Sequence, residues 1–234
     1  MNNIFRFKQF DLDQSDCGMK ISTDGIVFGS WVNATGCAKI LDVGAGSGLL
    51  SLMLAQRFPE AHIDAIEIEP TAAERARENF SNSLWSERLK LIEGDFKDFE
   101  PSGKYDLVVS NPPYYSTTHQ YSSSRRKLAR NTHALSLKNL VEGAKKVSPE
   151  GMFSVIIPAR FENELKGLCS ENGYGEVIET TELIPIHGKP SSRVMMTFTR
   201  SDSVRSERRN SLTVYNENSA YTEQFLKQTE AFYL

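Results

Sequence analysis

Short apolar runs alternate with longer segments of helical period through the central part of this 234-residue chain. This alternation is typical of consecutive βαβ units, which build a mostly parallel sheet with helices on both faces. Strands are predicted at 39–43, 62–67, 89–93, 105–110 and 152–157, with two more at 177–185 and 193–200. Helices are predicted at 48–58, 70–82, 135–147 and 161–172, and a last one at 220–232. The sequence therefore predicts an α/β fold.

Chain length and composition favour a single domain. With 39% hydrophobic and 24% charged residues, the chain can bury one sizeable core but is short for two full domains. We expect a cap segment at 1–38, a core at 39–200 and an extension at 201–234. No apolar run approaches the roughly 18 residues of a spanning helix, and the first residues, MNNIFRFKQF, lack the apolar stretch of a signal peptide. A cytoplasmic protein without a membrane span is expected.

The cysteines and histidines show none of the spacings that metal sites use. Cys17, Cys37 and Cys169 are scattered and form no CxxC pair, and the four histidines form no i, i+4 pair. We therefore expect reduced structural thiols and no bound metal. Separately, we favour a monomer.

A glycine-rich turn follows the first strong strand and precedes a helix, at residues 42–48 (DVGAGSG). Its glycines let the backbone pass close to a ligand at the carboxyl edge of the sheet, namely Gly44, Gly46 and Gly48. Dinucleotide enzymes use the spacing GxGxxG, whereas the third glycine position here is Leu49. The turn therefore favours a different nucleotide-like ligand.

Two carboxylates extend this nucleotide site. Glu67 ends the second strand, where a carboxylate can accept hydrogen bonds from ribose hydroxyls. Asp95 follows the third strand, where it can meet an adenine amino group. The alternative is a glycine-rich βα turn with ordinary helix caps, which explains Gly44 alone better than it explains the whole set.

The tetrapeptide Asn111-Pro112-Pro113-Tyr114 follows the fourth strand and is the most specific signal in the chain. Prolines cannot donate backbone hydrogen bonds, so the turn offers two acceptors, the Asn111 side-chain oxygen and the Pro112 carbonyl. Two acceptors on a planar amine favour a pyramidal nitrogen with a free lone pair, which is transition-state stabilisation by fixed dipoles. Tyr114 provides a face on which an extruded base can stack. The alternative is a proline-rich turn with a surface tyrosine.

Taken together, DVGAGSG, the acid ending the second strand and the Gly-Asp-Phe after the third resemble S-adenosylmethionine-dependent methyltransferases of class I, with a seven-stranded Rossmann-like sheet. The resemblance implies that S-adenosylmethionine is bound by the glycine turn and the residues around it. It places Asp42 near the methionine amino group, Glu67 on the ribose, Ile68 against the adenine face and Asp95 with Phe96 at the adenine edge. Residues 20–25 (KISTDG) are similar to a segment that covers the methionine end, which adds Lys20 and Thr23.

The NPPY tetrapeptide resembles the amino-methyltransferase branch of that class, and nearly the whole chain resembles the bacterial tRNA1(Val) (adenine(37)-N6)-methyltransferase family. Besides the two motifs above, the resemblance is carried by residues 5–32, by NPPYY, by RKLARNTHALSL and by PIHGKPSSRV. It implies methylation of the N6 amino group of an anticodon-loop adenine in tRNA, with Asn111, Pro112 and Tyr114 at the reacting base. Asn111 is also expected among the residues that bind the cofactor. Family members often read Arg-His where this chain has Arg130-Asn131.

Other acceptors and a non-enzymatic role stay open at this point. The same chemistry can act on ribosomal RNA, DNA or a protein glutamine. A non-catalytic module that binds the cofactor or RNA is the third hypothesis.

The charge distribution supports a nucleic-acid partner despite a formal net charge of −3. Residues 121–146 carry a net charge of +6 and residues 189–209 a net charge of +4, leaving −13 on the rest of the chain. Both windows are expected to flank the NPPY site and to contact phosphates, although each is also explained as a solvated surface. The residues predicted to bind RNA are Arg125, Arg126, Lys127, Arg130, Lys189 and Arg193.

Overall fold

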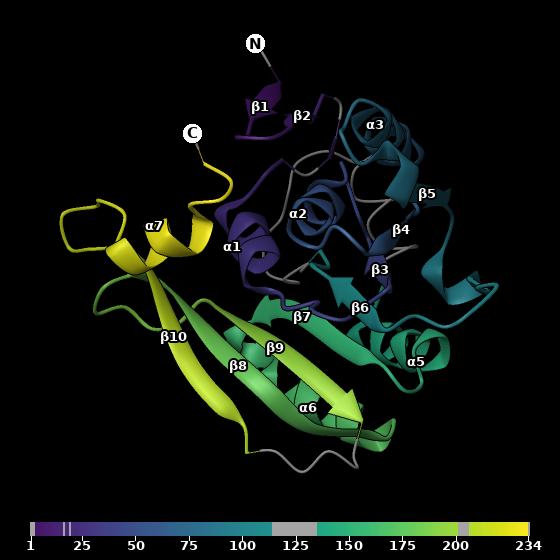
Figure 1. Ribbon diagram of the computed structural model, residues 1–234. Helices are drawn as coiled ribbons and strands as arrows, with labels where there is room; N and C mark the ends of the chain where they lie inside the picture. Colours follow the sequence, from purple (N-terminus) through teal and green to yellow (C-terminus); the bar gives the residue numbers. More distant parts are fainter. Residues whose placement is uncertain (1–2, 16, 19, 114–134, 201–205, 234) are drawn as a thin grey trace, which may run out of the picture.

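A computed structural model describes residues 3–15, 17–18, 20–113, 135–200 and 206–233. Its centre is an eight-stranded sheet in the order β10-β8-β9-β7-β6-β3-β4-β5 (Figure 1). The strands are β3 (Lys39–Val43), β4 (His62–Glu67), β5 (Leu89–Glu93), β6 (Leu107–Ser110), β7 (Met152–Pro158), β8 (Tyr174–Ile186), β9 (Arg193–Arg200) and β10 (Arg208–Tyr215). The predicted α/β class is confirmed, and four of the seven predicted strands have the predicted limits.

The helices are α1 (Thr23–Trp31), α2 (Leu49–Arg57), α3 (Pro70–Ser81), α5 (Leu137–Val147), α6 (Glu162–Glu171) and α7 (Glu223–Thr229). Three short 3-10 helices are also described, namely η1 (Ser86–Arg88), η2 (Phe96–Asp98) and η3 (Ala159–Phe161). Near the N-terminus, β1 (Ile4–Arg6) and β2 (Asp11–Asp13) form an antiparallel hairpin. The described part of the chain contains no helix with the length and apolar character needed to cross a membrane.

Strands β3 to β7 all run parallel, so their carboxyl ends meet at one edge of the sheet. The chain moves outward from β3 through β4 to β5 and then returns to β6 on the other side of β3. Such a reversal of strand order opens a crevice at the carboxyl edge, where α/β proteins bind ligands. The glycine turn after β3 and Asn111 after β6 therefore lie on adjacent strands at this edge.

Alternate residues of the central strands bury themselves on opposite faces of the sheet. Ile40 and Ile156 belong to the core that packs under α1 and α2, whereas Leu41 and Val155 belong to the core that packs under α5 and α6. Figure 1 shows these helix pairs on opposite sides of the sheet. Burial on both faces explains why the strands read as unbroken apolar runs.

The central sheet contains one strand more than the seven predicted, and this strand comes from the segment expected to be an extension. β10 pairs in parallel with β8 at the edge of the sheet. Its sequence, RRNSLTVY, opens with two arginines and exposes its first four residues, so it has no continuous apolar run to mark it as a strand. The charges are compensated across the pairing, because Arg209 forms ion pairs with Glu162 and Glu182.

Two local elements differ from expectation at the ends of the chain. The last helix is shorter than 220–232, because the Thr222 side chain caps it and it ends at Thr229. α1 lies within the predicted cap segment and was not predicted as a helix, since its TDGIVFGSW sequence contains two glycines and is mostly buried. It begins where the Ser22 side chain accepts a hydrogen bond from Gly25 N.

The C-terminal segment packs on the N-terminal part of the core. Lys8 N donates to Phe232 O, Gln56 Nε2 to Ala231 O and Gln228 Nε2 to Ser30 O. Figure 1 shows α7 beside α1, with both ends of the chain on the same side of the molecule.

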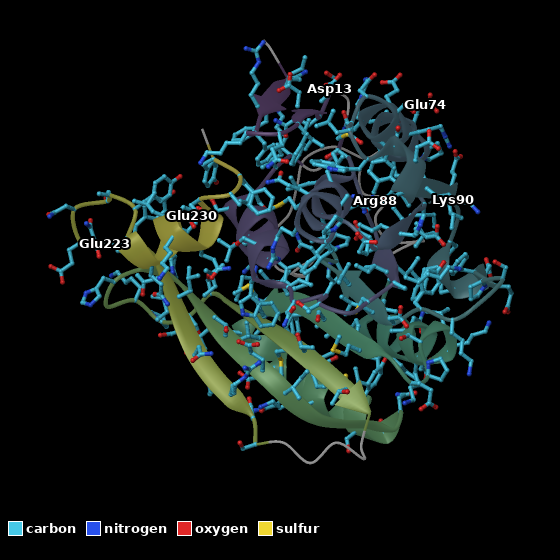
Figure 2. All side chains as sticks on the ribbon, in the orientation of Figure 1. Asp13, Glu74, Arg88, Lys90, Glu223 and Glu230 are labelled. Carbon is cyan, nitrogen blue, oxygen red and sulfur yellow. The ribbon has the colours of Figure 1, made fainter. Side chains whose placement is uncertain are left out.

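Arg88 provides a test of how the loops hold the helical layer. Its guanidinium donates to the carbonyls of Ala55, Phe58 and Ala61 around the end of α2, at 2.6 to 3.2 Å. Figure 2 shows Arg88 directed toward α2 and Lys90 at the periphery. Arg88→Ala is expected to lower the free energy of unfolding by about 2–3 kcal/mol, because it leaves carbonyls without a charged donor. Urea denaturation measures this change, and the exposed control Lys90→Ala should change it by less than about 0.5 kcal/mol. Equal effects of the two substitutions would contradict the assignment.

Candidate active site

The glycine turn between β3 and α2 holds its backbone N–H groups toward the end of β4. Gly44 N and Ala45 N donate to Ile66 O at 2.9 and 3.2 Å, and Gly46 N donates to Glu67 Oε2 at 2.8 Å. Gly44 has a φ of 76° and Gly46 a φ of 57°, values that favour glycine. A Cβ on either glycine would meet no other atom within 4 Å. The two residues thus border open space, which fits close approach of a ligand to the backbone.

Gly48 has a different role from the other two glycines. Its φ is 87°, and a Cβ there would lie 2.5 Å from the ring of Phe80. Gly48 is therefore required for packing of α2 against α3.

Glu67 is the best fixed of the predicted cofactor-binding side chains. It is 9% exposed, and its Oε1 accepts a hydrogen bond from Glu69 N at 2.9 Å while Oε2 accepts from Gly46 N. Each carboxylate oxygen has a second lone pair, so the group can also accept hydrogen bonds from a diol. The backbone of the same residue binds the end of β5, because Gly94 N donates to Glu67 O at 2.9 Å. This hydrogen bond links the ends of β4 and β5.

Ile68 and Asp95 are partly exposed next to Glu67, whereas the Phe96 ring is buried. Asp95 caps η2, since Oδ1 accepts from Lys97 N at 3.0 Å and Oδ2 pairs with Lys97 Nζ at 3.0 Å. A Cβ on Gly143 of α5 would lie 2.5 Å from the Phe96 ring, so this ring packs against α5. Any ligand contact of Phe96 would therefore involve its backbone.

Asp42 is buried beneath the glycine turn and is only 1% exposed. Ser51 Oγ of α2 donates to its Oδ2 at 2.7 Å. Burial raises the pKa of Asp42 to about 7, and the negative charge of Glu67 raises it further, while the Ser51 hydrogen bond opposes the shift. Asp42 thus lies below the turn surface, in an environment that disfavours its charged form.

The start of α1 lies directly against Asn111. A Cβ on Gly25 would be 3.5 Å from Asn111 Nδ2 and 3.3 Å from Leu49 Cδ2. Ser110 Oγ donates to Val43 O at 2.7 Å and ties the end of β6 to the strand that carries the glycine turn. The predicted cap segment, the glycine turn and the Asn-Pro turn are therefore brought together, with Thr23 partly exposed and Lys20 exposed at the start of α1.

The Asn-Pro turn directly follows the end of β6 at the carboxyl edge of the sheet. Pro112 is buried, and Asn111 and Pro113 are partly exposed. The predicted residues Tyr114, Arg125, Arg126, Lys127 and Arg130 lie outside the described part of the chain.

An ion pair joins α1 to the start of β9, because Asp24 Oδ2 lies 3.0 Å from Arg193 Nε. The sequence did not single out Asp24, whose partner is far along the chain, and only its place in KISTDG marked the region. Lys189 is exposed in the turn between β8 and β9. Arg193 is thus joined to the helix that packs against Asn111, whereas no contact joins Lys189 to the described part of the site.

Three described residues of the two basic windows, Arg208, Arg209 and Lys145, are bound away from the site, contrary to expectation. Arg208 of β10 pairs with Glu179 of β8, and its neighbour Arg209 pairs with Glu162 of α6 and Glu182 of β8, so both charges are neutralised. At the far end of α5, Lys145 Nζ donates to Gly173 O and Pro149 O. Net charge along the sequence therefore overstates the cationic surface that these windows supply.

The described part of the chain contains no candidate metal site. No group of three histidine, cysteine, aspartate or glutamate side chains there could hold an ion.

Residues 28–147 match the methyltransferase small domain family. The chain is 40% identical to a tRNA1(Val) (adenine(37)-N6)-methyltransferase from Aliivibrio fischeri, a match that covers 100% of this chain and 99% of that protein. It is 38% identical to a protein of the same name from Haemophilus influenzae over 98% of each chain. For another of that name, from Aeromonas hydrophila, the identity is 35% over 100% of this chain and 98% of the relative.

Solved structures of methyltransferases share the fold. A predicted O-methyltransferase from Agrobacterium tumefaciens superposes with a TM-score of 0.69 at 21% identity, covering 89% of this chain and 96% of the other. A TehB-like SAM-dependent methyltransferase from Corynebacterium glutamicum has a TM-score of 0.51 at 15% identity, covering 78% of this chain and 90% of the other. These matches confirm the predicted Rossmann-like methyltransferase fold.

Alanine substitutions at two glycines should separate ligand binding from stability. Gly46→Ala points a methyl group into open space and should cost only about 1 kcal/mol of stability from its positive φ, yet weaken binding of S-adenosylmethionine at least about tenfold. Gly48→Ala should lower the free energy of unfolding by about 2–4 kcal/mol, through strain and overlap with Phe80. Calorimetric titration and urea denaturation of both variants provide the measurements. Unimpaired binding by the Gly46 variant would show that the ligand lies elsewhere.

Burial of Asp42 predicts a pH-dependent effect on stability. The folded protein keeps this carboxyl protonated up to about pH 7, whereas the unfolded chain releases the proton near pH 4. The folded state therefore binds more protons in this window, so this group makes stability fall as pH rises from about 4 to 7, by at most about 1.4 kcal/mol per pH unit. Relative to wild type, Asp42→Asn should gain stability across this window and stay level above it. Urea denaturation at several pH values measures the difference, which would be constant if Asp42 had an ordinary pKa.

Proposed function

This chain belongs to the tRNA1(Val) (adenine(37)-N6)-methyltransferase family, and from that premise we propose that it methylates the N6 amino group of adenine 37 in tRNA1(Val), with S-adenosylmethionine as the cofactor. The observation that carries the proposal is the placement of two half-sites at one edge of the sheet. The glycine turn and Glu67 form the first, and Asn111 with Pro112 forms the second.

The residues of the first half-site fit the cofactor. Open space over Gly44 and Gly46 admits a ligand close to the backbone, and the anchored Glu67 carboxylate suits ribose hydroxyls. Asp95 and the backbone of Phe96 would meet the adenine edge, and Ile68 its face. The Asp42 carboxyl below the turn would border the methionine end, together with Lys20 and Thr23 at the start of α1. When bound, S-adenosylmethionine supplies an electrophilic methyl group.

The second half-site prepares the adenine amino group. Its nitrogen is conjugated with the ring, so its lone pair is poorly nucleophilic. We expect Asn111 Oδ1 and the Pro112 carbonyl to accept the two N–H groups and to favour a pyramidal nitrogen. These dipoles are fixed before the reaction, because Ser110 anchors the turn to β3 and Gly25 packs against Asn111. No strong general base is needed for this step.

An adenine in an anticodon loop is unpaired or easily unstacked, so it can be turned out of the loop at modest cost. Tyr114 is proposed to stack on the extruded base, an interaction worth roughly 1–3 kcal/mol. Under this proposal the substrate is transfer RNA, so the enzyme is expected to act in the cytoplasm, where tRNA is used. We also propose that it acts as a monomer.

Asn111→Ala tests the function and its mechanism together. Loss of one fixed acceptor should lower kcat for methyl transfer to tRNA by about 10²–10³-fold, as removal of comparable preorganised groups does. Binding of S-adenosylmethionine should change by less than about threefold. Transfer of a labelled methyl group to purified tRNA1(Val) and calorimetric titration of the cofactor measure the two quantities.

Nucleoside mass spectrometry of tRNA from a deletion strain identifies the acceptor. The expected result is loss of N6-methyladenosine at position 37 of tRNA1(Val) and its return when the wild-type chain is expressed. Unchanged N6-methyladenosine at that position would contradict the proposed acceptor and would favour ribosomal RNA, DNA or a protein glutamine instead. Absence of any transfer by the wild-type protein would favour a non-catalytic module.

A further inference from the structure

The carboxyl end of β7 forms a raised wall beside the Asn-Pro turn. β7 is the neighbour of β6, and Ser110 pairs with Val155. β6 ends there, whereas β7 continues for three more residues to Pro158, which at about 3.3 Å per residue extends about 10 Å further along the strand direction. Asn111 therefore lies at the foot of the wall, and the residues after Pro158 form its rim.

Arg160 is part of that rim and is held there by regular structure. It is the middle residue of η3, and Ala159 N donates to Ser192 O at 3.2 Å, which ties η3 to the start of β9. The side chain is exposed, and its guanidinium lies 4.6 Å from the centre of the Phe161 ring. Such stacking restrains the planar group while leaving its N–H donors available.

The neighbouring carboxylates are bound to other cations. Glu162 accepts hydrogen bonds from both terminal nitrogens of Arg209 and pairs with Lys166 on α6. Asp24 pairs with Arg193. Among the described residues, Arg160 has no carboxylate within ion-pair distance, so its charge is not neutralised at the rim.

We infer that Arg160 binds a phosphate of the RNA strand that carries the target adenine, a contact that rests on the function proposed above. When a base is extruded, it enters the floor of the site while its backbone stays at the rim. A rim arginine with free donors on a stacked guanidinium suits a phosphate oxygen. Arg193, which the sequence favoured, already has Asp24 as a partner, so Arg160 is the better available cation of the two.

Arg160→Ala tests this contact against Arg208→Ala, which removes the same charge from an exposed, ion-paired arginine on β10. In steady-state assays with tRNA1(Val), Arg160→Ala is expected to raise KM for tRNA about tenfold, with kcat and cofactor affinity within about twofold of wild type. The slope of log binding constant against log salt concentration should decrease in magnitude by about 0.7–1, the change for one phosphate contact. Arg208→Ala should change neither quantity by more than about twofold.

Arg160→Lys distinguishes a phosphate contact from a packing effect. Lysine keeps a point charge, so this variant should recover most of the lost salt slope while losing the stacking on Phe161. An unchanged KM and salt slope in Arg160→Ala would overturn the inference, and so would equal losses in Arg160→Ala and Arg208→Ala. A lysine variant as weak as the alanine variant would also overturn it. Because wild-type transfer is measured in the same assay, failure of the proposed function appears separately, as absence of methylation by the wild-type protein.

Discussion

The site depends on one carboxylate, that of Glu67. Its two oxygens bind the backbone N–H groups of Gly46 and Glu69, and its carbonyl binds Gly94. One residue thus connects the loops that follow β3, β4 and β5. The cost of keeping a nearly buried charge is offset by hydrogen bonds to backbone donors, which leaves the outer lone pairs available for ligand hydroxyls.

The other half of the site is held by contacts across the chain rather than by a single residue. α1 approaches Asn111 through Gly25 and is joined to β9 through the ion pair of Asp24 with Arg193. The C-terminal segment packs beside α1, with Gln228 bound to the carbonyl of Ser30. Residues from the first, middle and last parts of the chain therefore set the position of the Asn-Pro turn.

Ion pairing explains why the net charges of the two basic windows overestimate the cationic surface that is available to RNA. A stretch rich in arginine gives a high net charge in sequence, yet Arg209 is matched by Glu162 and Glu182 on other elements. Ion pairs of this kind contribute little stability when exposed, but they decide which cations remain available to a polyanion. Arg160 lies outside both windows, yet among the described residues it has no carboxylate partner, unlike Arg193, Arg208 and Arg209.

The sequence by itself determined the elements whose signal is local. Strands β3, β4 and β9 were predicted to the residue, because burial on both faces makes them short apolar runs between turns. The glycine turn and the Asn-Pro turn indicated their chemistry through backbone constraints. Only the tertiary structure decided the rest: β10, because its charges become tolerable only opposite distant carboxylates; α1, because its glycines and bulky apolar residues favour a helix only when packed; and the pairing of Arg193 with Asp24, because no pattern along the chain specifies contacts between residues so far apart.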